Sequence, residues 1–212
     1  MAAATPTARP EPVLHYAGLV VRHGDGRMTY AFVPFKEETI SGIDLLKRSG
    51  ISQVTISFGG LGEGVCSLEG EGCSATACRR SVCQGSGVNA PFWQYFRQSA
   101  PGAWRPLTLG ASVTKVCDGD VDAWSWTGRE AGLPALSLAE VARLAGVPLN
   151  DGVPGGDRPV VQTAYPPGFV RPTEEKGQGT VVHVVAGTLL ALIGGGSIYA
   201  ARRRQLRGEA EG

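Results

Sequence analysis

The sequence has almost no excess charge of either sign. Its 20 Lys and Arg residues nearly balance its 19 Asp and Glu residues, so the formal net charge is +1. Proteins that bind nucleic acid through phosphates carry a basic stripe or patch on the bound face. No such stripe is present ahead of the arginines that close the chain, which excludes nucleic acid as the expected partner.

Motifs for catalysis are also missing. The sequence contains neither GxSxG nor HExxH, and His15 and His23 have no evident nucleophile or orienting carboxylate beside them. We interpret both histidines as surface residues near a turn. The glycine-rich stretch 59–64 follows an apolar run but is not continued by GK[ST], so it is not a phosphate loop. We expect a protein that is not an enzyme and has no cofactor.

Regular periodicity is sparse over long stretches of the chain. Its 31 Gly and 14 Pro residues together exceed a fifth of 212 residues, which indicates long loops or linkers. Where periodicity does appear, residues 17–22 and 28–35 predict a β-hairpin. A short helix follows, with Ser41 as N-cap and Gly50 at its end, and then residues 53–58 alternate as a half-buried strand.

A second group of short strands follows the cysteine-rich region. Residues 92–96 are aromatic on both faces of a predicted strand, residues 104–109 predict another, and residues 121–126 predict a last one after a turn at 118–120. The sequence DGDVD at this turn has oxygen donors at the spacing of a calcium loop. Ala123 and Arg129 occupy loop positions that require Gly and Glu, so an EF-hand is excluded and a tight turn is expected.

The aromatic residues of these strands are the candidate ligand-binding residues. Large aromatic side chains can fill the core against the predicted helix, or they can form a platform for a planar ligand. Alternation along a strand places some of them on the opposite face. The candidates are Trp93, Tyr95, Trp124 and Trp126, with Trp104 nearby.

Four cysteines lie within eighteen residues of the glycine-rich region 59–90. Cys66, Cys73, Cys78 and Cys83 are separated by six, four and four residues, whereas structural zinc sites show two short CxxC-type pairs. We therefore favour disulfides that order a loop with too little core of its own. Metal or iron–sulfur binding and free thiols are the alternatives. Cys117 makes the count odd, so it either pairs with the cluster or lies buried as a small apolar residue.

The C-terminal part predicts a membrane anchor. Residues 181–201 carry no formal charge and are long enough to cross a bilayer of about 30 Å. Because basic residues follow this segment and acidic ones precede it, the positive-inside rule places the tail in the cytoplasm and the bulk of the chain outside. A buried core helix and tail-anchored insertion are the alternatives. The span runs from Val181 to Ala201, and the cytoplasmic anchor consists of Arg202, Arg203, Arg204 and Arg207.

The remaining segments are less informative. Residues 1–15 have neither a basic nor an apolar signal region, so we expect a start codon placed too late or a linker left after cleavage of a leader. Residues 131–147 contain a helix with a Ser137–Glu140 capping box. Residues 148–180, rich in Gly and Pro, predict a linker to the membrane segment, and residues 202–212 form the basic tail.

Several motifs, in their order, resemble a family of bacterial surface domains similar to the C-terminal domain of transcobalamin. The motifs are ISGIDLL at 40–46, FWQYF at 92–96, GAS at 110–112 and DGDVDAW at 118–124, within a domain at 16–130. The resemblance implies an α+β fold of β-grasp type, with a small mixed sheet, one packed helix and a Cys-rich insertion at 59–90. The insertion lies outside the family pattern, and the helical barrel of transcobalamin is absent.

The resemblance implies a non-catalytic domain that binds a soluble ligand or helps to close a partner over one. Together with the predicted membrane span, it leads us to expect a membrane-anchored module at the outer face of the cell membrane that captures a soluble ligand or recruits a partner. A corrinoid is the first ligand class to test, and a membrane transport or surface protein is the expected partner. Two alternatives stay open on the residues alone. One is a structural or adhesive module without a small ligand, and the other is an extracytoplasmic redox or metal protein built on the cysteines.

Overall fold

The computed structural model describes residues 13–99, 102–150, 153–154 and 156–168. It is a mixed α+β structure, as the sequence predicts. Within the described residues, no helix is both long enough and apolar enough to cross a bilayer. The predicted membrane span at 181–201, the basic tail at 202–212 and residues 1–12 lie outside the described residues.

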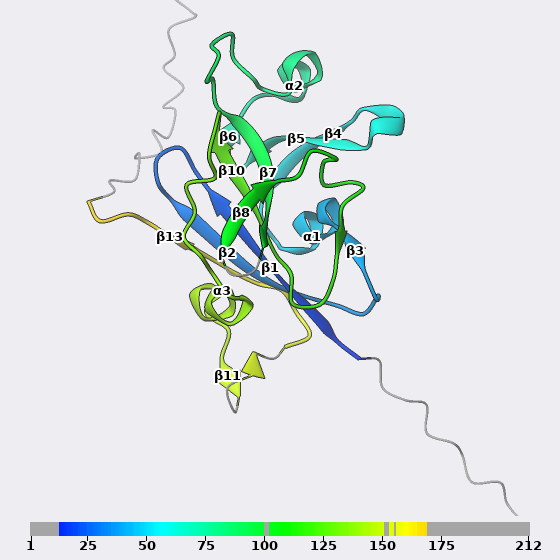
Figure 1. The fold of residues 1–212 in the computed structure, drawn as a ribbon, viewed down its shortest axis with the longest axis vertical. Helices are drawn as coiled ribbons and strands as arrows, with labels where there is room; N and C mark the ends of the chain where they lie inside the picture. Colours follow the sequence, from blue (N-terminus) through cyan, green and yellow to red (C-terminus); the bar gives the residue numbers. More distant parts are fainter. Residues whose placement is uncertain (1–12, 100–101, 151–152, 155, 169–212) are drawn as a thin grey trace, which may run out of the picture. The chain divides into compact units, whose positions relative to one another are not determined.

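A six-stranded sheet forms the centre of the molecule, in the order β13-β2-β1-β10-β7-β8 (Figure 1). All neighbouring pairs are antiparallel except β1 and β10, which run parallel. The predicted hairpin is confirmed as β1 and β2, with Gly26 at a φ of 87° in its turn. The strands are β1 (His15–Arg22), β2 (Met28–Phe35), β7 (Phe92–Ser99), β8 (Ala103–Pro106), β10 (Val121–Thr127) and β13 (Val160–Ala164).

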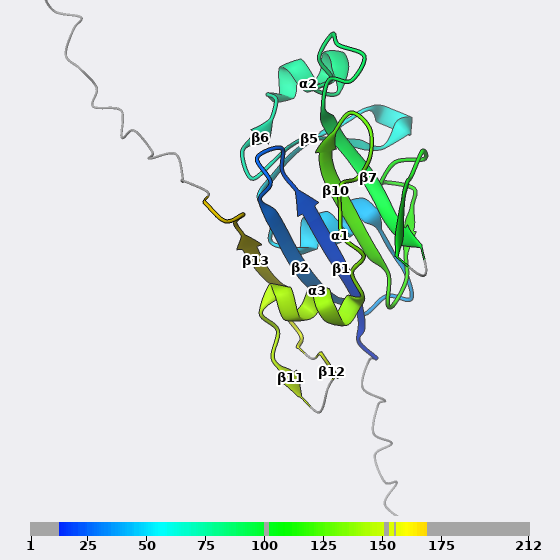
Figure 2. The ribbon, with the colours of Figure 1, turned by 60° about the vertical axis from the view of Figure 1, so that its left-hand side comes forward.

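Helices pack on both faces of this sheet. Helix α1 (Gly42–Arg48) covers one face, and helix α3 (Leu138–Ala145) crosses the other, as Figure 2 shows. The prediction of one packed helix is therefore wrong. The central strands β1 and β10 need cover on two sides because their residues are buried on both faces.

The predicted caps of both helices are confirmed. The Ser41 hydroxyl accepts from the backbone N–H of Asp44 at the start of α1, and Gly50 adopts a φ of 81° after its end. Ser137 and Glu140 form the capping box of α3, and Gly146 is left-handed at its C-terminus. These local signals fixed the helix ends because the first N–H groups of a helix lack partners within it.

The segment predicted as a linker at 148–180 contributes to the fold. Its residues Val160–Ala164 form β13, which pairs with β2 at the edge of the sheet. Strands β11 (Leu149–Asn150) and β12 (Val153–Pro154) form a small hairpin before it. Periodicity missed β13 because an edge strand next to solvent needs little apolar alternation.

The cysteine-rich insertion carries regular structure that the sequence did not reveal. Its strands β5 and β6 pair onto β4, which confirms the strand predicted at 53–58, and form a three-stranded sheet in the order β4-β5-β6. Helix α2 (Ala75–Ser81) follows. The pairing of β4 with β5 shifts between Val54 and Thr55, where Cys66 is an extra residue on the β5 side. Val54 is exposed although simple alternation predicts it on the buried face. The strands are β4 (Gln53–Ser57), β5 (Glu63–Leu68) and β6 (Glu71–Gly72), with a 3-10 turn η1 at Gly59–Leu61. Outside this sheet, the short strands β3 (Ile40–Ser41) and β9 (Lys115–Val116) pair with each other.

Candidate functional site

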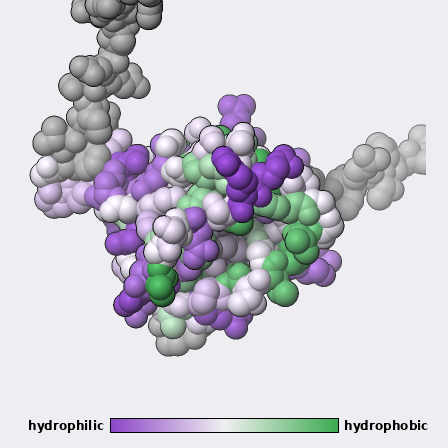
Figure 3. Space-filling model, turned by 90° about the horizontal axis from the view of Figure 1, so that it is seen from above, coloured by the Kyte–Doolittle hydropathy of each residue, from purple (hydrophilic) through white to green (hydrophobic). Residues whose placement is uncertain are grey.

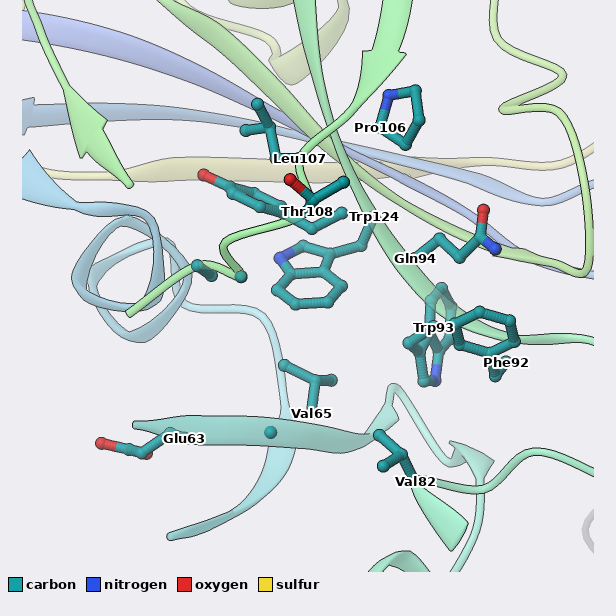
Figure 4. Close-up of a pocket in the computed structure, with 14 residues that line it drawn as sticks. Glu63, Val65, Val82, Phe92, Trp93, Gln94, Pro106, Leu107, Thr108 and Trp124 are labelled. Carbon is teal, nitrogen blue, oxygen red and sulfur yellow. The ribbon is translucent and has the colours of Figure 1, made fainter. Parts of the chain in front are cut away.

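An aromatic pocket of about 490 Å³ lies between the central sheet and the insertion. In Figure 4, Trp93 and Trp124 of the sheet stand across the pocket from Val65 and Val82 of the insertion. Figure 3 views the molecule from the end that carries the insertion, and this face is hollowed near its middle. The lining residues are Glu63, Gly64, Val65, Val82, Phe92, Trp93, Gln94, Tyr95, Pro106, Leu107, Thr108, Gly110, Ala111 and Trp124.

Three of the four predicted ligand-binding residues line this pocket. Trp93 and Tyr95 alternate along β7 and reach the same face of the sheet as Trp124 of β10. Trp126 is on that face too, but it packs beside Trp93, with ring centroids 5.3 Å apart, and does not line the pocket. Trp104 is on the α3 side, where its indole N–H donates to the carbonyl of Pro134.

The sequence left two interpretations of the aromatic residues open, core packing and a platform for a ligand, and the structure has features of both. Trp93, Tyr95 and Trp124 are only 4–5% exposed, so they are core residues and not an open platform. Their buried rings nevertheless form one wall of a hollow that the insertion closes from the other side. The pocket is therefore a product of packing two sheets against each other, and alternation along one strand does not predict it.

One polar group of the aromatic wall is left without a partner. The indole Nε1–H of Trp124 is buried and has no hydrogen-bond acceptor among the described residues. By contrast, the Trp93 indole N–H donates to the Glu71 carbonyl, and the Tyr95 hydroxyl donates to Asp122. A buried N–H without an acceptor costs free energy, so Trp124 differs in this respect from the other two rings of the wall.

Behind the pocket, Tyr95 belongs to a buried ionic network. Asp122 is fully buried and accepts two hydrogen bonds from the Arg97 guanidinium, from Nε at 2.6 Å and from Nη2 at 2.9 Å. Burial alone would lower the pKa of Arg97, but its bonds to Asp122 and the charge of Asp120 raise it. Burial and the charge of Asp122 raise the pKa of Tyr95, so its phenol stays protonated and donates. The network holds one wall of the pocket rigid.

The pocket carries little net charge. Among its lining residues only Glu63 is ionisable at neutral pH, and Lys47 forms an ion pair with it. The hydrogen bonds from Lys47 and Thr55 lower the pKa of Glu63, so the carboxylate stays ionised and balanced. An uncharged ligand with a flat apolar body therefore suits this cavity better than a strongly charged one.

Two disulfides order the insertion wall of the pocket. Cys66 bonds to Cys78 and Cys73 bonds to Cys83, which ties β5 and the β6 end to helix α2 and the residues after it. The sulfur atoms of Cys73, Cys78 and Cys83 lie within 4.8 Å of one another, but sulfur in a disulfide supplies no thiolate to a metal. The disulfide prediction is confirmed, and the pairing is one that sequence alone left open.

Cys117 takes no part in this pairing. It is free and exposed, so the expectation that it either pairs or lies buried is wrong. It stands just before the predicted turn, where the Asp120 carboxylate accepts from the Cys117 backbone N–H at 2.8 Å. Asp118 accepts from the backbone N–H of Tyr16, and Gly119 has a φ of 87°. The DGD motif is thus a turn that also fixes the start of β1.

The sequence interpretation missed one polar cluster. His23, predicted as a surface residue, is fully buried between the carboxylates of Glu69 and Glu71. Burial alone would lower its pKa, but the hydrogen bonds to the two carboxylates outweigh burial and raise it. The signal in the sequence was the pair of glutamates two residues apart in LEGEG, but only the fold brings that pair to the hairpin turn.

Comparisons with known proteins identify no relative. Neither the protein-family models, the curated proteins nor the solved structures contain a match to this chain.

Proposed function

We propose that this protein is a non-enzymatic, membrane-anchored module that captures a small, flat and largely uncharged ligand outside the cytoplasm. The observation that carries the proposal is the aromatic pocket with the unpartnered Trp124 indole N–H in its wall. A cavity of this size, apolar in lining and with few polar groups, is typical of small-molecule sites. The favoured ligand has an aromatic or conjugated body and one acceptor oxygen or nitrogen.

The topology supports the finer fold assignment. A hairpin followed by helix α1, with β1 parallel to the later strand β10, is the arrangement expected of a β-grasp-like domain. We therefore keep the resemblance to transcobalamin-like surface domains as part of the proposal. A complete corrinoid is larger than a pocket of about 490 Å³, so a corrinoid would place only one edge inside.

The location is proposed on two grounds. Residues 181–201 are the membrane anchor, with Arg202, Arg203, Arg204 and Arg207 on the cytoplasmic side. Two disulfides in the insertion are typical of a domain that faces an oxidising compartment. A ligand held at the membrane surface would then pass to a membrane transport or surface protein partner.

A second function is favoured by exposed apolar residues near the pocket. Leu61 is 85% exposed in η1, and Leu109 and Val113 are 77% and 59% exposed in the loop before β9. The two segments are neighbours, because the Ser112 hydroxyl accepts from the Glu63 backbone N–H at 2.8 Å. Such apolar loops suit an adhesive or partner-binding module that takes no small ligand.

A binding experiment with the full chain distinguishes ligand capture from the adhesive function. The probes are the uncharged dye N-phenyl-1-naphthylamine, followed by fluorescence, and a panel of soluble metabolites that includes corrinoids, followed by equilibrium dialysis. Trp124→Phe removes the indole N–H and should weaken binding of acceptor-bearing probes about tenfold. Trp104→Phe removes an indole N–H on the opposite face and should leave probe affinity unchanged.

A blocking variant makes the test independent of core packing. Thr108 is exposed at the pocket, so Thr108→Trp should fill the entrance without disturbing the fold and should abolish probe binding. If Thr108→Trp and Trp124→Phe both bind the dye as the parent chain does, and no metabolite binds, the ligand-binding function is rejected in favour of the adhesive module.

A further inference from the structure

A buried histidine joins the insertion to the central sheet. His23 lies in the turn between β1 and β2, which stands beside β6 in Figures 1 and 2. Its Nδ1 is 2.7 Å from a Glu71 carboxylate oxygen, and its Nε2 is 2.8 Å from a Glu69 carboxylate oxygen. Glu71 also accepts from the backbone N–H of Gly24. The two glutamates of the insertion thus bind the turn between β1 and β2.

Only one protonation state of the ring satisfies both contacts. An ionised carboxylate only accepts hydrogen bonds, and a neutral imidazole donates from one nitrogen only. Two short contacts to carboxylates therefore require the imidazolium, which donates from Nδ1 and Nε2 together. Loss of its proton would leave either Glu69 or Glu71 without its donor while both stay close to the ring.

The surrounding groups offer the ring a second arrangement. Arg27 Nη2 is already 3.3 Å from His23 Nδ1, so a deprotonated Nδ1 can accept from Arg27 in place of donating to Glu71. Arg27 is held nearby by Asp25, at 2.7 Å. On the other side, the hydroxyls of Thr29 and of Thr163 in β13 hydrogen-bond to Glu69, which keeps that carboxylate in position. Glu71 is thus the carboxylate that a neutral ring would release.

The turn between β5 and β6, which carries Glu69, has an unfavourable backbone conformation. Glu69 has a φ of 47° and Gly70 a φ of 84°, so Glu69 occupies the left-handed region that glycine or asparagine prefers. A long acidic side chain at such a position is easier to explain by its bonds to His23 and Thr29 than by the turn itself.

We propose that His23, Glu69 and Glu71 form a protonation-dependent latch that holds the insertion against the sheet and so controls the aromatic pocket. The connection to the pocket runs through Trp93. Its ring meets the His23 ring edge-on with centroids 5.6 Å apart, its indole N–H donates to the Glu71 carbonyl, and it lines the pocket. Release of the Glu71 carboxylate would loosen that wall and β6, while Glu69 stays bound to Thr29.

The effect of the latch on ligand affinity rests on the proposed function, but the latch itself can be tested without any ligand. Nitrogen NMR of the full chain with labelled histidine reports the protonation of each ring nitrogen over a series from about pH 5 to about pH 10. We expect both His23 nitrogens to stay protonated above the ordinary histidine pKa near 6.5. Amide exchange at residues 69–72, corrected for intrinsic rates, should rise over the same interval. A neutral His23 ring at about pH 6 would overturn the latch.

A single substitution separates the latch from a general effect of pH. The amide introduced by Glu71→Gln can donate to a neutral Nδ1 and still accept from Gly24, so the alkaline rise in exchange should disappear. Glu38→Gln removes the same charge at an exposed site with no hydrogen bond or ion pair among the described residues, and it should keep that rise. Equal behaviour of the two variants contradicts the latch.

Control of the pocket is tested with N-phenyl-1-naphthylamine, which is uncharged, over the same pH series. Its affinity should fall at least about threefold as His23 loses its proton, and by reciprocity saturating dye should raise the His23 midpoint by about half a pH unit. Affinity that does not change through the His23 titration would refute control of the pocket. Absence of dye binding at every pH would instead contradict the proposed function, and the exchange data would still decide whether the latch opens.

Discussion

Gly42 and Tyr95 show how closely single residues determine this core. Gly42 begins α1, and a methyl group added to it would collide with the Tyr95 hydroxyl, which donates to the buried Asp122. The glycine in the ISGIDLL motif therefore makes room for an aromatic side chain fifty residues later in the chain. This contact explains the glycine without any need for a special backbone conformation.

Gly42→Ala should destabilise the protein by about 2 kcal/mol, because either the helix or Tyr95 must move and weaken its bond to Asp122. Chemical denaturation measures the change. Gly60→Ala is the matched control: nothing lies within 4 Å of its added methyl group, and a change within about 0.5 kcal/mol is expected. Equal stability of the two variants would show that Tyr95 is not confined by α1.

Stability should depend on pH through His23 and Glu69. His23 has a pKa raised above its ordinary value near 6.5, so its contribution is complete below that value and is lost as the pH rises through the folded pKa. Burial would raise the pKa of Glu69, but the bonds from His23 and Thr29 outweigh it and lower the pKa. Its contribution is therefore present above its ordinary value of 4.5 and is lost as the pH falls through the folded pKa.

The unfolding free energy at constant ionic strength should thus be highest between these two limits, with an alkaline fall of about 1.4 kcal/mol for each unit by which the His23 pKa is raised. Urea denaturation at a series of pH values measures it. His23→Gln should flatten the alkaline limb, since a side-chain amide does not titrate. A stability that increases from about pH 7 to about pH 9 would contradict the assignment.

At the scale of elements, the insertion depends on covalent bonds more than on its own core. Its small apolar cluster contains Ile56 and the cysteines themselves, with Phe58 packed against it. The disulfides close loops of 12 and 10 residues in sequence separation, and each stabilises such a loop by about 2 to 3 kcal/mol. The insertion wall of the pocket therefore needs oxidising conditions to persist.

Thiol labelling tests this dependence. Protein from its native compartment, denatured without reductant, should take up one maleimide, at Cys117, and should weigh about 4 Da less than its reduced form. After reduction all 5 cysteines should react. Five labels before reduction would show that the insertion is not cross-linked in the cell and would remove one of the two grounds for an extracytoplasmic location.

At the scale of the whole molecule, two helices cover the sheet and the later chain returns to complete its edge. Helix α3 packs on Phe32 and Val20 within the second core cluster, and β13 then pairs with β2. The folded unit therefore extends to about residue 168 and not to 130. Fewer residues therefore separate it in sequence from the proposed anchor at 181–201.

Membrane attachment is the prediction that belongs to this scale. The full chain should sediment with membranes and resist alkaline carbonate extraction, whereas deletion of residues 181–201 should release it into the soluble fraction. Protease added to intact cells should remove the part of the chain before the span. Complete protection of that part in intact cells, with membrane attachment retained, would reverse the proposed orientation.

The sequence by itself determined the features that depend on neighbouring residues. The β1–β2 hairpin, the caps of α1 and α3, the aromatic strand β7 and the DGD turn all follow from local signals, because periodicity and unpaired helix-end groups act over a few residues. Alternation along β7 likewise accounts for Trp93 and Tyr95 lying on one face. These are properties of short segments.

Only the tertiary structure decided which distant segments meet. The pocket exists because the insertion packs over Trp93 and Trp124, and the disulfide pairing follows from the positions of β5 and α2. His23 is buried because Glu69 and Glu71 reach it from more than forty residues away. Burial and charge pairing of this kind depend on distances in space, and a local pattern carries no information on them.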